Sequence, residues 1–147
     1  MITVVPDTTV LVSAAISRQG NPFRLLLAWQ EGELSLVVCP HLLDELTDVL
    51  HRDRLGRFIS RQEASEFVDY LRRTADLRSD PRLVIGLVPE DPDDDYLVAL
   101  AREAGVDYLV SGDDHLVRLP SPRSPVVTPA QLVDRLDELR KAGALGQ

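Results

Sequence analysis

Residues 90–101 read EDPDDDYLVALA and combine five carboxylates in the first six positions with an almost uninterrupted apolar run. Such carboxylates can bind a cation, cap a helix or face solvent. If Pro92 is the first helical residue, Asp91 is the natural N-cap and the acids at 93–95 fill the first turn, where negative charge interacts favourably with the helix dipole. Helix initiation therefore explains most of these acids. The remaining question is whether one of them belongs to a reaction site.

Helical spacing narrows the choice of a reactive acid to two residues. Asp94 lies in line with the apolar residues three, four and seven positions further on, at the leading end of a buried stripe. Asp93 is aligned with apolar residues in a similar way, so periodicity does not separate the two. Asp95 lies in line with Ala99 and Arg102 on the only polar face of this helix, and we expect it to face solvent.

Three further acids stand where α/β folds place their sites. In open parallel sheets the ligand crevice lies at the carboxyl ends of the strands. Asp7 directly follows the apolar run ITVV, Asp113 follows residues 108–110 after a Ser-Gly turn, and Glu45 lies on the flank of the apolar stripe of a helix. Each has an ordinary alternative, because acids after strands often cap the next element and acids on helix flanks are often solvated.

The elements that would position these acids alternate between strand and helix. Short apolar runs rich in β-branched residues predict buried strands at 2–5, 34–38, 83–88, 108–110 and 126–127. Helices are predicted from amphipathic patterns starting at Pro22, Pro40, Pro92 and Pro129 and from a more charged segment at 61–75. This alternation predicts an α/β fold, a three-layer α/β/α sandwich with a central parallel sheet. No linker or repeat divides the chain, so we expect one domain over residues 1–147.

The four acids indicate a function more clearly as a group than singly. Asp7, Glu45, an acid at 93 or 94, and Asp113 come from different βα units and would converge on one edge of the sheet. Carboxylates about 4 Å apart repel by about 1 kcal/mol even in water, so such a cluster requires cations or protons. Oxygen ligands without nearby His or Cys favour Mg²⁺ or Mn²⁺. Such an ion can activate a water and stabilise charge on a phosphodiester undergoing cleavage.

Composition limits the classes of protein that the sequence can encode. With 24 acids against 16 bases, the formal charge of -8 should repel a polyanion unless metals or local basic patches intervene. A single cysteine, Cys39, excludes an internal disulfide. No basic and apolar leader and no long uncharged span is present, so we expect a cytoplasmic protein without a membrane segment.

Four segments resemble the successive motifs of PIN-domain ribonucleases, a family that includes the VapC-type toxins. They read VVPDTTVLVSA, LLDELTDVL, DPDDDYLVALA and DYLVSGDDHLVRL, and they occur in order between residue 2 and residue 119. The resemblance implies an α/β/α sandwich with a parallel sheet, a divalent metal held by acids, and endonucleolytic cleavage of RNA. The cation expected is Mg²⁺ or Mn²⁺.

Carried over position by position, the resemblance implies four catalytic and metal-binding acids, which are Asp7, Glu45, Asp94 and Asp113. Asp94 is selected because it precedes Ala101 by seven positions, as the family motif requires. We expect Asp7, Asp94 and Asp113 to ligate the metal, and Glu45 to bind it through water or to orient the attacking hydroxide.

Two hydroxyl residues accompany the acids in the family pattern. Thr8 and Ser111 match these positions, and we expect them to hold a phosphate oxygen or a ligand carboxylate; the alternative for each is a local turn hydrogen bond. The sequence departs from the pattern at Thr9 and Asp95, where Asn is common, and at His115, where another acid is common. These departures leave the four acids intact.

The sequence also suggests partners. An RNA substrate could be contacted by a group of arginines, although interleaved acids favour a solvated, salt-bridged face; the group comprises Arg52, Arg54, Arg57, Arg61, Arg72 and Arg73. The resemblance implies a homodimer and, for a toxin, a cognate antitoxin. The alternative function is a catalytically silent PIN-like module that binds RNA or protein without turnover.

Overall fold

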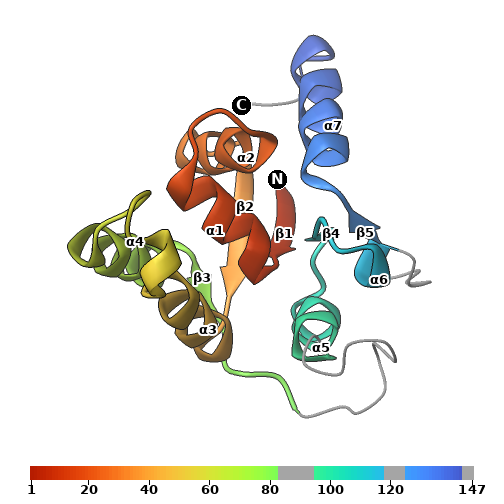
Figure 1. Cartoon of the computed structure of the whole chain (residues 1–147). Coiled ribbons are helices and arrows are strands. Elements are labelled where there is room, and N and C mark those ends of the chain that lie inside the picture. Colours follow the sequence, from red (N-terminus) through yellow and green to blue (C-terminus); the bar gives the residue numbers. More distant parts are fainter. Residues whose placement is uncertain (83–94, 118–124, 144–147) are drawn as a thin grey trace.

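A single parallel sheet organises the protein. The computed structural model describes residues 1–82, 95–117 and 125–143. Five strands pair in the order β3-β2-β1-β4-β5, and all four pairings are parallel (Figure 1). The strands are β1 (Ile2–Pro6), β2 (Leu34–Val38), β3 (Asp76–Leu77), β4 (Tyr108–Val110) and β5 (Val126–Val127). The sheet therefore extends from β1 through β2 and β3 on one side and through β4 and β5 on the other. The direction of strand order reverses between β1 and β4, which is the topological switch point.

Helices cover both faces of this sheet, which gives the three-layer α/β/α sandwich that the sequence predicts. Helices α1, α2 and α7 lie on one face and α5 on the other, while α3 packs against α1 and forms a hairpin with α4 (Figure 1). The helices are α1 (Thr8–Ile16), α2 (Asn21–Gln30), α3 (Pro40–Leu50), α4 (Arg61–Thr74), α5 (Asp95–Ala104), α6 (Asp114–Val117) and α7 (Pro129–Lys141), with a 3₁₀ turn η1 (Asp53–Leu55).

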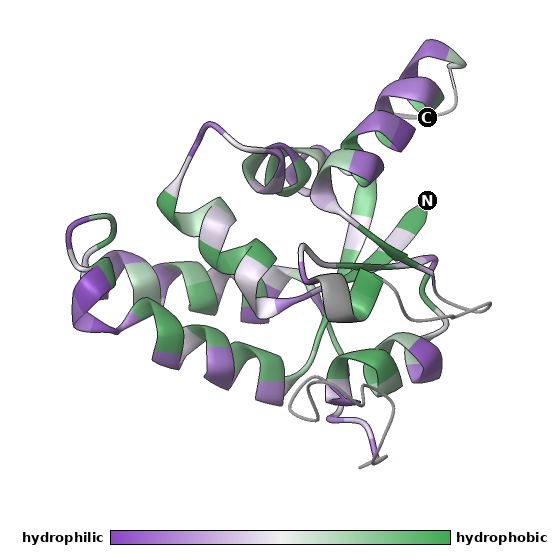
Figure 2. Ribbon diagram, turned by 45° about the vertical axis from the view of Figure 1, so that its right-hand side comes forward, coloured by the Kyte–Doolittle hydropathy of each residue, from purple (hydrophilic) through white to green (hydrophobic). Residues whose placement is uncertain are grey.

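The core lies on both sides of β1. Val4 and Val5 are almost completely buried, as β1 pairs with β2 from Ile2↔Leu34 and with β4 from Val4↔Tyr108. The central strands are mainly hydrophobic, whereas α3, α4 and α7 alternate hydrophobic and hydrophilic residues (Figure 2). This is the pattern expected for a buried parallel sheet covered by amphipathic helices. Within the described residues, every helix is too short or too polar to cross a membrane.

Most strand predictions are confirmed. The runs at 34–38, 108–110 and 126–127 form strands with the predicted bounds, and the first strand extends by one residue to Pro6. The run at 83–88 lies outside the described residues. No sequence pattern predicts β3, because its two residues are both exposed and carry no apolar run.

Helix α1 was also not predicted. Its sequence TTVLVSAAI is apolar over most of its length and rich in β-branched residues, so it lacks the periodicity that marks an amphipathic helix. The helix is started instead by a local cap, because the side chain of Asp7 accepts a hydrogen bond from the backbone N–H of Val10. The other predicted helices are present. The predicted first residue of α5, Pro92, lies outside the described residues, and the described helix begins at Asp95.

An ion pair ties the C-terminal helix α7 to the start of β2. Glu33, only 8 % exposed, accepts two hydrogen bonds from the guanidinium of Arg140, at 2.6 and 2.7 Å. Arg140 also donates to Asp137 on its own helix at 2.6 Å. The hydrogen bond and charge of Arg140 lower the pKa of Glu33 and outweigh the opposite effect of burial. This fork geometry orients both groups and fixes α7 against α2.

Candidate active site

The end of β1 presents a buried carboxylate. Asp7 is 4 % exposed and follows the last residue of the strand. Its Oδ1 accepts hydrogen bonds from Val10 N at 2.9 Å and from Thr9 Oγ1 at 2.7 Å, while its Oδ2 accepts one from Ser111 Oγ. A carboxylate offers about four lone-pair positions, so, as far as the described residues show, these three donors leave one for a further ligand. The donors also compensate the charge of a carboxylate that burial would otherwise destabilise.

Ser111 joins this carboxylate to the end of β4. The serine is completely buried, and its Oγ donates to Asp7 while accepting a hydrogen bond from the backbone N–H of Asp113 at 2.9 Å. The backbone supports the same junction, since Asp7 N donates to Val110 O at 2.9 Å. Asp113 then starts α6, because its carbonyl accepts from the backbone N–H of Leu116 at 3.1 Å. Asp7 and Asp113 are therefore brought together at the switch point of the sheet.

A tyrosine of α5 holds Glu45 of α3 by a hydrogen bond. The phenol of Tyr96 donates to Glu45 Oε2 at 2.6 Å, and its ring packs against His41 with the centroids 4.1 Å apart. Burial, together with the bond to Glu45, raises the pKa of Tyr96. The phenol therefore stays protonated at neutral pH and remains a donor to the carboxylate. Glu45 is half-buried, as its place on the flank of the apolar stripe predicts, whereas Asp44 and Asp48 on the same helix are exposed.

Thr8 is close to both Asp7 and Tyr96. It follows Asp7 directly, and its hydroxyl is close enough to Tyr96 to lower the pKa of that phenol slightly against the larger opposing effects. Thr8 is 8 % exposed, and within the described residues its Oγ1 has no hydrogen-bond partner of normal geometry. A buried hydroxyl without a partner is costly. Because Tyr96 also bonds Glu45, this hydroxyl lies close to the candidate site and is available to a further polar group there.

The sequence prediction for Asp95 is wrong. Its alignment with Ala99 and Arg102 predicts that it faces solvent, but Asp95 is 4 % exposed. Ala99 is buried as well, so the side of α5 that carries Asp95 is covered, and fully exposed residues begin only at Arg102. Alanine is compatible with either environment, so it did not reveal on which side the helix is covered. Asp93 and Asp94, between which helical spacing could not choose, lie outside the described residues.

The described acids suit a hard divalent cation by chemistry, without forming a complete site. Asp7, Glu45 and Asp113 offer only oxygen donors, which Mg²⁺ and Mn²⁺ prefer. Within the described residues, however, no three His, Cys, Asp or Glu side chains come close enough to hold a metal ion. Asp94, the fourth acid of the predicted set, lies outside these residues. The side chain of His115 is likewise not described.

Cys39 is not a nucleophile of this site. It is fully buried at the N-cap of α3, where a helix dipole favours a thiolate. Burial nevertheless raises the pKa of the Cys39 thiol to about 12, and nearby Asp80 adds to the increase. Asp80 accepts a hydrogen bond from His41 N at 2.8 Å and so takes over part of the capping of α3. No local sequence pattern indicates this cap or the role of Tyr96, because both contacts join segments far apart in the chain.

Comparisons with known proteins agree with this architecture. A family model described as PIN domain matches residues 3–115. The crystal structure of PAE2754 from Pyrobaculum aerophilum superposes with a TM-score of 0.66 at 19% identity, over 93% of this chain and 96% of that chain. The crystal structure of VapBC2 from Rickettsia felis, bound to a DNA fragment from their promoter, gives a TM-score of 0.59 at 12% identity, over 86% and 98%. A search of curated proteins found no match.

Proposed function

This chain belongs to the PIN-domain family, whose members are generally nucleases, and from that membership we propose that it is a metal-dependent endoribonuclease. The observation that carries the proposal is the buried unit of Asp7 and Ser111 with Asp113 at the switch point of a parallel sheet. The family match at residues 3–115 includes all four expected acids, Asp7, Glu45, Asp94 and Asp113. The substrate class is RNA and the cation Mg²⁺ or Mn²⁺.

Each residue has a distinct part in the proposed reaction. Asp7, Asp94 and Asp113 hold the cation, which when bound stabilises the negative charge that develops on the scissile phosphate. Ser111 fixes the carboxylate of Asp7, so that its remaining lone pair points in a constant direction. Glu45 orients the attacking water and accepts its proton. The buried hydroxyl of Thr8 donates to a non-bridging phosphate oxygen or to a ligand carboxylate.

The function is tested by incubating the purified protein with single-stranded RNA and with Mg²⁺, Mn²⁺ or EDTA. We expect cleavage with either cation and none with EDTA. RNA binding without cleavage under every condition would favour the alternative, a silent PIN-like binding module.

The biological role that we propose is the toxin of a toxin-antitoxin pair. Support comes from the likeness to a chain of VapBC2, a protein that was solved on a promoter fragment. The expected state is a cytoplasmic homodimer with an antitoxin encoded beside it. Expression of the chain alone should arrest growth, and co-expression of the adjacent small reading frame should restore it. Intact RNA cleavage without growth arrest would indicate that the protein is an RNA-processing enzyme and not a toxin.

Asp94 and Asp95 can be separated by substitution. We expect Asp94→Asn to lower metal-dependent cleavage by about 100-fold or more, because a ligand to the cation is lost and the cation contributes several kcal/mol. Asp95→Asn should leave cleavage within a few-fold of the wild type. Thermal melting of both variants checks that each is folded, which matters because Asp95 is buried. Full activity of both variants would remove Asp94 from the site.

Tyr96 is expected to position Glu45. Tyr96→Phe removes the hydrogen bond to Glu45 and should lower kcat by roughly tenfold, the lower end for a bond to a charged group, with little change in KM. Tyr108→Phe is the matched control, because Tyr108 lies at the opposite end of β4 and should retain full activity. An equal loss in both variants, or a loss in KM alone, would contradict the positioning role.

A further inference from the structure

The connection between α3 and α4 is strongly basic in a chain whose formal charge is -8. Residues 51–61, here called the arginine turn, read HRDRLGRFISR and contain a single acid, Asp53. The four arginines are all exposed; they are Arg52, Arg54, Arg57 and Arg61. A local positive surface on an acidic protein is the arrangement that a polyanion requires for binding.

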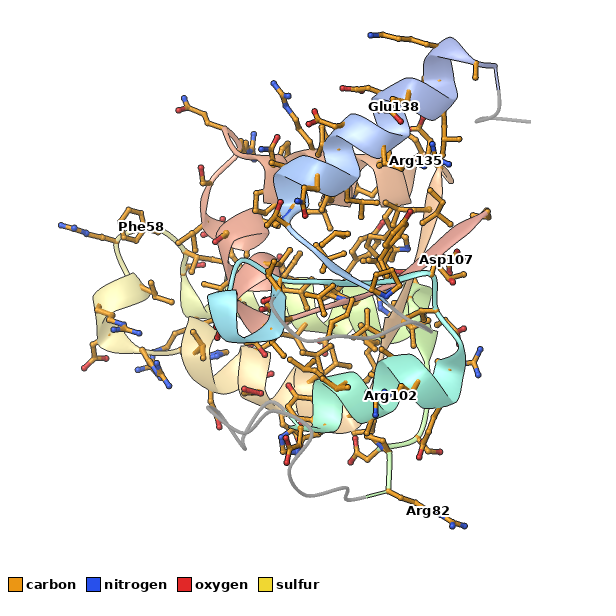
Figure 3. The ribbon with its side chains drawn as sticks, turned by 90° about the vertical axis from the view of Figure 1, so that its right-hand side faces the viewer. Phe58, Arg82, Arg102, Asp107, Arg135 and Glu138 are labelled. Atoms are coloured by element: carbon orange, nitrogen blue, oxygen red, sulfur yellow. The ribbon has the colours of Figure 1, made fainter. Side chains whose placement is uncertain are left out.

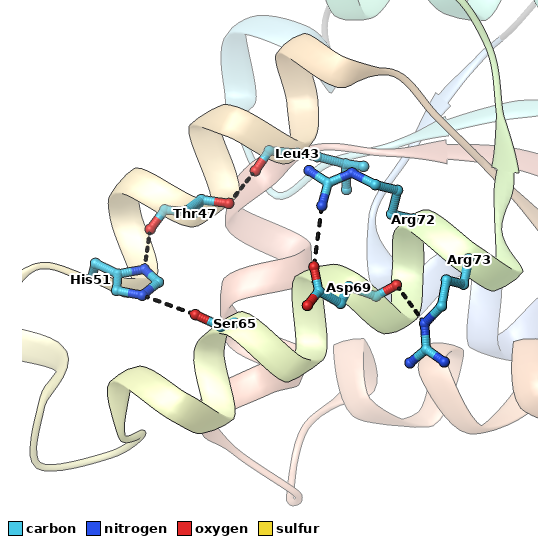
Figure 4. Close-up of polar contacts among 7 residues, drawn as sticks. All are labelled: Leu43, Thr47, His51, Ser65, Asp69, Arg72 and Arg73. Carbon is cyan, nitrogen blue, oxygen red and sulfur yellow. Dashed lines mark hydrogen bonds and ion pairs between the residues drawn. The ribbon is translucent and has the colours of Figure 1, made fainter.

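Most arginines of the turn have no ion pair among the described residues, unlike Arg72 and Arg73 further along α4. Within the described residues, the turn has one ion pair, from Arg61 to Asp53 at 3.8 Å, and both side chains are highly exposed, so the pair contributes little. In contrast, Arg72 pairs with the Asp69 side chain at 3.2 Å and Arg73 donates to the Asp69 carbonyl (Figure 4). Among the described residues, Arg61, Arg72 and Arg73 therefore each contact an aspartate, whereas Arg52, Arg54 and Arg57 have no ion pair.

Acids next to the turn are also occupied. Glu63, in the first turn of α4, accepts a hydrogen bond from Ser60 N at 3.0 Å as part of a capping box. Glu66 accepts one from the amide of Gln62 at 3.1 Å. These bonds hold the two carboxylates along α4, where both keep their negative charge because their donors are neutral. The arginines of the turn are exposed to solvent beside them.

An exposed aromatic ring accompanies the cations. Phe58 is 52 % exposed and projects away from the body of the protein (Figure 3). The guanidinium of Arg57 lies 5.0 Å from the centre of its ring. A single exposed phenylalanine is ordinary, but a ring beside free guanidinium groups can stack on an unpaired base while the arginines bind phosphates.

The arginine turn borders a pocket, and hydrogen bonds of His51 hold its start against α4. A pocket of about 200 Å³ lies between the end of α3 and the start of α4, and its lining includes His51, Arg52, Ser60 and Arg61. His51 joins the two helices, since its Nδ1 donates to Thr47 O at 2.8 Å and its Nε2 shares a hydrogen bond of 3.4 Å with Ser65 Oγ (Figure 4). The cations are thus presented by a fixed hairpin.

Helix α3 connects this surface to the proposed active site. Glu45 lies on α3, and at 1.5 Å per residue the helix rises only about 8 Å from Glu45 to its last residue, Leu50. A single RNA strand can therefore reach the turn within a few nucleotides of the phosphate that is cut.

We propose that the arginine turn binds the sugar-phosphate backbone of single-stranded RNA beside the scissile phosphate, with Phe58 stacking on a base. This inference rests on the proposed function, because it takes RNA as the substrate. It explains how an acidic protein retains an acidic substrate away from its metal site.

The test measures binding of a labelled 20-nucleotide single-stranded RNA by fluorescence anisotropy in EDTA, where no cleavage occurs. The logarithm of the binding constant of the wild type should fall linearly with the logarithm of the salt concentration. The triple variant Arg52→Gln, Arg54→Gln, Arg57→Gln should make this slope shallower by about 2, because each lost phosphate contact accounts for about 0.7. The control removes the same charge elsewhere, through Arg72→Gln, Arg73→Gln, Arg135→Gln, and should keep most of the slope. Phe58→Ala should weaken binding by roughly tenfold without changing the slope.

Failure of this inference is distinguishable from failure of the nuclease proposal. Metal-dependent cleavage with a KM for the 20-mer that the arginine-turn variant does not change would overturn the inference and leave the nuclease intact. RNA binding in EDTA that is lost in this variant, without any cleavage by the wild type, would overturn the nuclease proposal and leave the arginine turn as an RNA-binding surface. Absence of RNA binding by the wild type in EDTA, or equal losses in the two triple variants, would also overturn it.

Discussion

Replacement of Asp7 by Asn is expected to lower metal-dependent RNA cleavage by at least about 100-fold. Asp7 is the buried acid of the candidate site, and the amide removes the negative charge that a cation requires. A cation stabilises the transition state by several kcal/mol, and each 1.36 kcal/mol is a factor of ten in rate. The measurement is the initial rate of RNA cleavage with Mn²⁺ or Mg²⁺, together with Mn²⁺ affinity from a direct titration.

The variant separates chemistry from folding. An amide oxygen still caps α1 by accepting from Val10 N, so Asp7→Asn should melt close to the wild type, whereas Asp7→Ala also loses the cap, at a cost of about 1 kcal/mol. Asp107→Asn is the matched control. Asp107 accepts hydrogen bonds from Thr3 at the opposite end of the same two strands, and this variant should keep full activity (Figure 3). Wild-type cleavage by a folded Asp7→Asn variant would disprove the site.

Replacement of Arg140 by Met is expected to lower the free energy of unfolding by about 2 kcal/mol. The change leaves the carboxylate of Glu33, 8 % exposed, without its two charge-assisted hydrogen bonds. Because the Arg140 side chain is 43% exposed, we expect less than the full cost of breaking a buried pair. Thermal melting should show a decrease in Tm of about 4–8 °C for a chain of this size.

The control for this variant is on the same helix. Arg135 pairs with Glu138 at 3.4 Å, and both side chains are mostly exposed (Figure 3). Arg135→Met should therefore change the free energy of unfolding by less than about 0.5 kcal/mol. Equal destabilisation by the two substitutions would show that general charge, not the Glu33 contact, stabilises α7.

The effect of Arg140 should depend on pH in a defined direction. Arg140 lowers the pKa of Glu33 in the folded state below its ordinary value of about 4.3. The stabilisation is therefore complete at neutral pH, declines below about pH 4.3 as the unfolded state gains a proton, and is lost as the pH falls through the lowered pKa. Denaturant unfolding at a series of pH values should show the wild type and Arg140→Met converging in acid. A constant difference would exclude Glu33 as the partner.

Much of the fold follows from local patterns. Runs such as LSLVV at 34–38 can be buried on both faces only as interior strands, and the prolines at the first or second position of α2, α3 and α7 mark helix starts. The resemblance to PIN domains is confirmed by the family match. Elements without such patterns were missed. The apolar helix α1 depends on the cap by Asp7, and the two-residue strand β3 depends on its pairing with β2.

The sequence by itself determined the fold class, the strand ends that carry Asp7 and Asp113, and the half-buried position of Glu45, because periodicity and turn chemistry are local. Only the tertiary structure decided that Ser111 bonds Asp7, that Tyr96 holds Glu45 and that Asp95 is buried. These features depend on which elements cover a given face, and no local pattern records that. Helical spacing places an acid on one side of a helix; the neighbouring segments decide whether that side meets water.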